Sequence, residues 1–185
     1  ETSKKNLLAI KQQHEKRVSS FVKFAETLGL TLATYEYKLS ISSGFKKKGL
    51  FNDAYCPNLK KINLEFSYIP KIYVAKEHAN NKCAFQVILD HEIDHHQVNY
   101  TNKGKYISWL EKDLPIVVEN LTSKYRPVPK SRIDTMSKKI ETDVKDVIDT
   151  YINKMYADTM EQNAKLDTKG EYVRLNRELI KCYRR

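Results

Sequence analysis

The sequence has few of the residues that interrupt regular structure. Glycine and proline occur only five times each in 185 residues, which argues against a flexible or all-turn protein. It also lacks any run of about 18 apolar residues, so no segment is predicted to span a membrane. A chain of this length is most simply one domain, 1–185, with a sizeable hydrophobic core.

Cysteine is also scarce. The three cysteines are Cys56, Cys83 and Cys182, and their spacing does not match a zinc knuckle. They permit one disulfide and one free thiol if the protein is exported. In a cytosolic protein the same residues would be three buried, reduced cysteines, and the sequence leaves both alternatives open.

Acidic residues are fewer than basic ones, 23 against 33, which gives a net charge of +10. Such an excess could attract the protein to anionic surfaces such as nucleic acid, anionic lipid or acidic glycans. The basic residues are scattered, however, and no nucleic-acid-binding motif is present. We therefore predict no specific nucleic-acid partner and interpret most of the charge, including the basic turn 46–49, as a solvated surface.

Three of the five histidines fall within six positions, in the segment 90–96. His91 and His95 belong to a His-Glu-x-x-His motif. Four residues advance a helix by about 400°, so both imidazoles project from one face and could share a zinc ion. Glu92 lies about 100° further round the helix, where it could reach a zinc-bound water as general base.

The residues before this motif, 83–89, are mostly apolar and predict a buried helix. Burying histidines and carboxylates is costly unless they are paired or hold a metal. The alternative is a solvated, polar helix end without metal. Asp90 and Asp94 are candidates to orient an imidazole, and His96 is a candidate for an outer-shell or substrate contact.

The His-Glu-x-x-His motif resembles that of the zincin metallopeptidases. The segments 70–77 and 81–83, together with 167–174 and the following Cys182, resemble a group of small secreted bacterial zincin-like proteins. The resemblance covers residues 55 to 183. It implies an α+β, zincin-like fold, mostly helical, with a small antiparallel or mixed sheet packed on the motif helix. It also implies a secreted or periplasmic location after removal of a signal peptide.

A catalytic zinc needs three protein ligands, and no histidine follows His96. The third ligand must then be a carboxylate, an upstream histidine such as His78, or a tyrosine. Glu119 and Glu171 are the leading candidates. We favour Glu171 because it begins a helix in the part that resembles the secreted group. For an exported protein we also expect Cys83 to pair with Cys182.

Hydrophobic periodicity predicts the elements along the chain. Turns are expected at 42–44 and Pro70, and a helix end at 102–104. The segment 105–125 reads as mixed, with a helix after Pro115. His14, on the apolar stripe of the first helix, is interpreted as a core residue. The predicted elements are an N-terminal helix 4–28, a sheet region 30–76 with extended runs at 30–42, 62–66 and 71–75, the metal helix 82–100, and C-terminal helices within 132–183, of which the first covers 132–163.

These features predict a zinc-dependent metallopeptidase that hydrolyses peptide bonds in a peptide or protein substrate. Glu92 would activate the water, and Tyr172 is a candidate to stabilise the oxyanion. The alternative is a non-catalytic zincin-like binding or assembly module of the cell envelope. A third hypothesis is a basic nucleic-acid or glycan binder in which the histidines are incidental.

Overall fold

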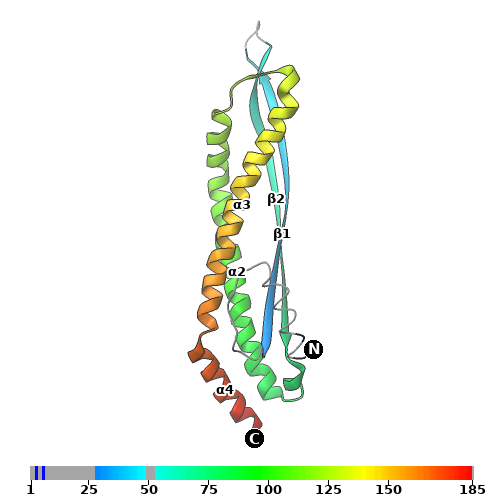
Figure 1. The fold of residues 1–185 in the computed structure, drawn as a ribbon. Helices are drawn as coiled ribbons and strands as arrows, with labels where there is room; N and C mark the ends of the chain where they lie inside the picture. The colour runs from blue at the N-terminus through cyan, green and yellow to red at the C-terminus, as the bar shows by residue number, and fades with distance from the viewer. Residues whose placement is uncertain (1–2, 4–5, 7–27, 49–52, 185) are drawn as a thin grey trace. The chain divides into compact units, whose positions relative to one another are not determined.

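The computed structural model describes residues 3, 6, 28–48 and 53–184. Most of the predicted N-terminal helix 4–28, including His14, lies outside the described residues. The described chain is α+β, as predicted (Figure 1). Its elements are β1 (Gly29–Lys47), β2 (Ala54–Val74), a short 3-10 helix (Lys76–His78), α2 (Lys82–Ser123), β3 (Val128–Pro129), a second 3-10 helix (Lys130–Arg132), α3 (Ile133–Leu166) and α4 (Lys169–Tyr183).

The sheet is antiparallel with strand order β1-β2-β3. β3 is only two residues long, and it pairs Val128 with Tyr55 and Pro129 with Ala54. Contacts divide the chain into two compact units that share the long elements. Within the described residues, unit 1 contains 28–34, 68–101 and 159–184, and unit 2 contains 35–48, 53–67 and 102–158.

The helix that carries the motif is longer than predicted. It does not end at 102–104, because α2 continues to Ser123. Its buried side chains recur every three or four residues, and Asn102 and Tyr106 continue that row across Gly104. Pro115 also lies inside the helix, between the buried Leu114 and Val118. The free energy gained by burying this row exceeds the free energy by which Gly104 and Pro115 destabilise a helix.

The strands are also longer than predicted. The turn expected at 42–44 is absent, because β1 runs through Gly44 to Lys47. The runs 62–66 and 71–75 belong to one strand, β2, and Pro70 lies inside it without a turn. Since β3 pairs only near the start of β2, only β1 is a strand neighbour of Pro70 in the described sheet. A proline that lacks an N–H is tolerated at such an edge.

The C-terminal helices agree with the sequence prediction. The predicted helix 132–163 is α3, and the last helix begins after Thr168, whose hydroxyl accepts a hydrogen bond from the Glu171 N–H. In unit 1, α4 packs on the first turns of α2. The apolar cluster there contains Leu28, Val74, Ala84, Ile88, Leu175, Leu179 and Cys182.

In unit 2 the hairpin packs on the helices through an apolar cluster of its own. The buried members of this cluster are Leu110, Leu114, Val118, Ile140, Val144 and Ile148. No helix in the described part of the chain combines the length and apolar character needed to cross a membrane.

A disulfide joins Cys83, in the first turn of α2, to Cys182 near the end of α4, which confirms the expected pairing. Cys56 is a free thiol. Beside the disulfide, the side-chain amide of Asn81 donates to the Cys182 carbonyl at 3.2 Å, and the His78 Nδ1 lies 2.6 Å from the Tyr183 hydroxyl. These contacts fasten α4 to the start of the motif helix.

Replacing both Cys83 and Cys182 with serine is expected to lower the free energy of unfolding by about 2–5 kcal/mol, because the disulfide closes a long loop in the unfolded chain. The two cysteines are 99 residues apart. Urea denaturation under non-reducing conditions measures the change. The control, Cys56→Ser, should alter stability by less than about 0.5 kcal/mol. Equal stability of the double variant and the control would contradict the proposed contribution of the disulfide.

Candidate metal centre

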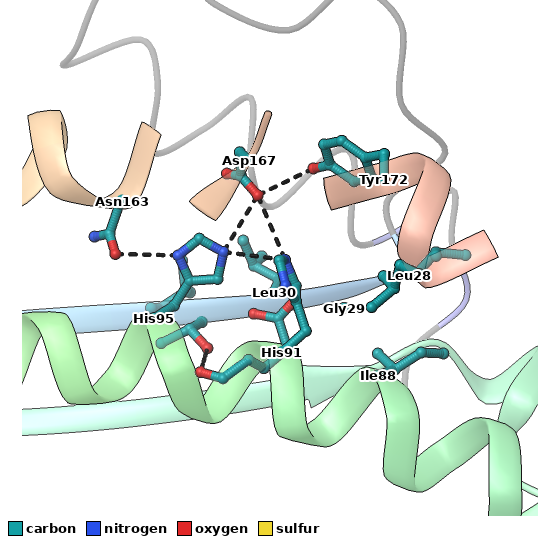
Figure 2. A pocket seen from close by; sticks show the side chains of 13 residues that line it. Leu28, Gly29, Leu30, Ile88, His91, His95, Asn163, Asp167 and Tyr172 are labelled. Carbon is teal, nitrogen blue, oxygen red and sulfur yellow. Dashed lines mark hydrogen bonds and ion pairs between the residues drawn. The ribbon is translucent and has the colours of Figure 1, made fainter. Parts of the chain in front are cut away.

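Three potential metal ligands meet in unit 1. The donor atoms of His91, His95 and Asp167 all lie within 4.8 Å of one another. His91 and His95 are one helical turn apart on α2 and both are buried, which agrees with the prediction that they face the same way. Figure 2 shows the two imidazoles turned toward the carboxylate of Asp167, which follows the last residue of α3.

The three donor atoms form a nearly equilateral triangle. His91 Nε2 lies 3.3 Å from His95 Nε2, and Asp167 Oδ1 lies 3.2 Å from His95 Nε2 and 3.5 Å from His91 Nε2. Zinc bonds of 2.0–2.1 Å in tetrahedral geometry separate adjacent ligands by about 3.3–3.4 Å. The triangle therefore has the dimensions of three tetrahedral zinc ligands, and this donor set fits the metal.

The hydrogen bond at the other nitrogen of His95 fixes its tautomer. His95 Nδ1 lies 3.0 Å from the side-chain oxygen of Asn163, on the last turn of α3 (Figure 2). Because an amide oxygen only accepts, Nδ1 carries the proton and the neutral ring presents the lone pair of Nε2. The lone pair then faces the carboxylate of Asp167, an arrangement that needs a proton or a cation between the two atoms.

Asp167 is held by the junction between α3 and α4. Its N–H donates to the Asn163 carbonyl at 3.2 Å, and the next residue, Thr168, is the N-cap of α4. The hydroxyl of Tyr172, one turn into α4, donates to Asp167 Oδ1 at 3.2 Å (Figure 2). The position of this carboxylate thus depends on how α4 packs against α2.

Glu92 is buried beside the triangle, with only 4% of its surface exposed. Its backbone carbonyl accepts a hydrogen bond from the Thr31 hydroxyl at 2.8 Å. Gly29 packs so closely that a Cβ there would lie 2.5 Å from Glu92 Oε1. Burial raises the pKa of Glu92, although His95, Thr31 and His91 oppose the shift. A raised pKa suits a carboxyl group that gains and loses a proton near neutral pH.

The triangle opens into a cavity of about 230 Å³. Its polar wall contains the triangle, Glu92, Thr31, Asn163 and Tyr172. The remaining lining comes from Leu28, which directly precedes β1, from Gly29, Leu30 and Leu32 of β1, from Ile88 of α2 and from Leu175 of α4. A potential general base, three potential metal ligands and an outer strand of the sheet therefore surround one small space.

The protonation of His95 makes metal binding dependent on pH. Burial lowers the pKa of His95, but the hydrogen bond and charge of Asp167, with Asn163 and Glu92, outweigh it and raise the pKa above the ordinary 6.5. In the metal-free protein this proton stabilises the fold below pH 6.5, and the contribution is lost as pH rises through the raised pKa.

Because zinc needs the neutral imidazole, we expect its apparent affinity to fall by up to about tenfold per pH unit below the raised pKa of His95. Competition with a chromophoric chelator between about pH 5.5 and 8 measures the dependence. An affinity that stays constant across this range would contradict the assignment of His95 as a ligand.

The other candidate ligands lie elsewhere. Glu171 is not in the cluster: it forms an ion pair with Arg174 on α4. Glu119 is exposed on the part of α2 that belongs to unit 2. His78 contacts Tyr183, as described above, and is not in the cluster. Among the described residues, the third member of the cluster is therefore Asp167, and the favoured Glu171 lies outside it.

The proposed supporting residues also differ. Asp90 and Asp94 are exposed, and Asp90 accepts a hydrogen bond from Gln86 instead of orienting a histidine. Asn163 orients His95. His96 stacks on Tyr68, and its Nδ1 lies 2.8 Å from the Tyr68 hydroxyl.

Sequence reasoning missed Asp167 and Asn163, although Asp167 belongs to the segment 167–174 on which the resemblance rests. An aspartate directly before a helix cap, with a tyrosine five residues later, was the available signal. No sequence signal identified Asn163, because an asparagine near the end of a long helix is usually an exposed residue.

Comparison of the chain with protein-family models, with curated proteins and with solved structures finds no match.

Proposed function

We propose that the protein is a zinc-dependent metallopeptidase. The observation that carries the proposal is the triangle of His91, His95 and Asp167, whose edges of 3.2–3.5 Å match three tetrahedral zinc ligands. The buried Glu92 beside it and the adjoining cavity support a catalytic use of the metal.

His91, His95 and Asp167 would hold the zinc ion beside the cavity that these residues line. Zinc bound there would acidify water and polarise the substrate carbonyl. Glu92 takes the proton of the attacking water and later delivers it to the departing amine. The buried position of Glu92 and the contact with Gly29 restrict its side chain to this wall of the cavity.

Tyr172 would stabilise the oxyanion by turning its single hydroxyl proton from Asp167 Oδ1 to the substrate. Burial, together with the charge and hydrogen bond of Asp167, raises its pKa, so the hydroxyl keeps its proton and remains a donor. It lines the same cavity as Glu92. A hydrogen-bond donor placed at the developing negative charge stabilises the transition state of peptide hydrolysis.

The peptide substrate would lie along β1. This is an outer strand of the described sheet, and its residues Leu30–Leu32 line the cavity. Extended peptides commonly bind by adding a strand to a sheet edge. The Cys83–Cys182 disulfide supports a secreted or periplasmic location, because disulfides persist in oxidising compartments.

A non-catalytic, zincin-like binding or assembly module is the second candidate. It is favoured by the position of Asp167 and Tyr172, because a metal held by α2 and the α3–α4 junction would tie these elements together beside the disulfide. Zinc would then contribute to folding only.

The test measures zinc in protein purified without added metal, followed by cleavage of a peptide library. We expect one zinc per chain and cleavage that a chelator abolishes and added zinc restores. Stoichiometric zinc without cleavage would favour the structural module. Absence of zinc binding at neutral pH would overturn both functions.

A further inference from the structure

The positive charge of unit 2 is concentrated where the hairpin and the α2–α3 connection meet. One segment contributes Lys46, Lys47 and Lys48, at the end of β1. The other segment, 124–132, contributes Lys124, Arg126, Lys130 and Arg132. Pairing of β3 with Ala54 and Tyr55, and a hydrogen bond from the Lys48 N–H to the Ala54 carbonyl at 2.7 Å, bring these segments together.

We call this surface the basic end. It has seven basic residues, all exposed, and two acidic residues, each of which follows one of the two segments in the sequence. Figure 1 shows both segments at one end of the hairpin. The basic residues are Lys46, Lys47, Lys48, Lys124, Arg126, Lys130 and Arg132, and the acidic residues are Asp53 and Asp134.

Counting charges shows that the basic end is unusual. The rest of unit 2 has ten basic and ten acidic residues and is neutral, so the whole excess of five positive charges in unit 2 lies at this end. This excess already includes the two acidic residues. Lys47 pairs with Asp53 at 3.2 Å, and Asp134 lies in the first turn of α3, where a negative charge interacts favourably with the helix dipole. A solvated surface alone would not require this segregation of charge.

The composition of the basic end favours a surface of phosphate groups over a nucleic acid. Five of the seven residues are lysines, which act as point charges rather than as bidentate readers of bases. Binding of single strands uses exposed aromatic rings for stacking. The neighbouring Phe45 and Tyr125 pack against the apolar cluster of unit 2, and the Tyr125 hydroxyl donates to Asp143.

We propose that the basic end docks the protein on an anionic phospholipid bilayer. Exposed lysines and arginines near such a membrane each strengthen binding, and the attraction decays within a Debye length. This surface belongs to unit 2, whereas the residues of the candidate metal centre belong to unit 1. The proposal is therefore independent of the proposed peptidase function.

Sedimentation of the full chain with lipid vesicles tests the proposal. We expect binding to phosphatidylcholine vesicles that contain about 30% phosphatidylglycerol, no binding to phosphatidylcholine alone, and release at about 0.5 M salt. The variant K46E/K48E should reduce the partition coefficient at least about 25-fold, taking roughly fivefold for each lysine.

The control K112E/K154E makes the same change of net charge at two exposed positions on α2 and α3 outside the basic end. It should reduce partitioning less than about fivefold. Circular dichroism checks that both variants are folded. Equal loss in both variants would overturn the proposal, because overall charge would then explain binding. Failure to bind anionic vesicles, or tighter binding to a DNA duplex with the same sensitivity to K46E/K48E, would also overturn it.

Discussion

Replacing Glu92 with glutamine is expected to reduce peptide hydrolysis by about 10²–10⁴-fold while zinc remains bound, because general acid–base catalysis contributes about that much. Glutamine has the same shape as glutamate, so it fits the space beside Gly29 and Ile88. It cannot accept the proton of the attacking water. Glu92 is outside the triangle of donor atoms, so metal content should stay at the wild-type level.

The matched control is Asp94→Asn, which removes one carboxylate from the same helix at an exposed position. It should leave turnover within about twofold of the wild type, since surface substitutions have small effects. Turnover at constant substrate, with zinc measured in the same samples, distinguishes the two variants. If Glu92→Gln kept wild-type turnover, Glu92 would not be the general base.

The fold was predictable where its signal is local. The apolar row that predicts the helix 132–163 lies within a single segment, and α3 confirms that prediction. The continuation of α2 past Gly104 and Pro115 was not predictable from local sequence, because it depends on burying Tyr106, Leu110 and Leu114 against distant parts of the chain. Helix propensity is a weak indicator of where a helix ends when tertiary packing opposes it.

The candidate site also contains residues that local sequence predicts and residues that it does not. The common face of His91 and His95 follows from helical geometry, since the two residues are four positions apart. Asp167 follows His95 by 72 residues, and its approach depends on the packing of α4 against α2 through Leu175, Leu179 and Cys182. No periodicity within one segment encodes such a contact. The sequence alone therefore favours a glutamate on α4, Glu171, over the aspartate directly before the cap of that helix.

Replacing Asp167 with asparagine is expected to weaken zinc binding by more than about 100-fold, because loss of an outer-shell partner alone costs 10–100-fold. Asparagine keeps the shape of the side chain and can still accept the hydrogen bond from Tyr172. It removes the negative charge that faces both Nε2 atoms at 3.2 and 3.5 Å. The loss should therefore arise at the metal site, with the fold preserved.

The control for Asp167→Asn is Glu171→Gln, which removes one negative charge four residues further along the chain. The carboxylate of Glu171 is paired with Arg174, and an exposed ion pair of this kind contributes about 0–1 kcal/mol. Zinc affinity should therefore stay close to that of the wild type in Glu171→Gln. Chelator competition gives the affinities, and circular dichroism confirms that both variants are folded. If Glu171→Gln lost zinc while Asp167→Asn kept it, the third ligand would be Glu171 and not Asp167. The packing of α4 on α2 would then have to differ when zinc is bound.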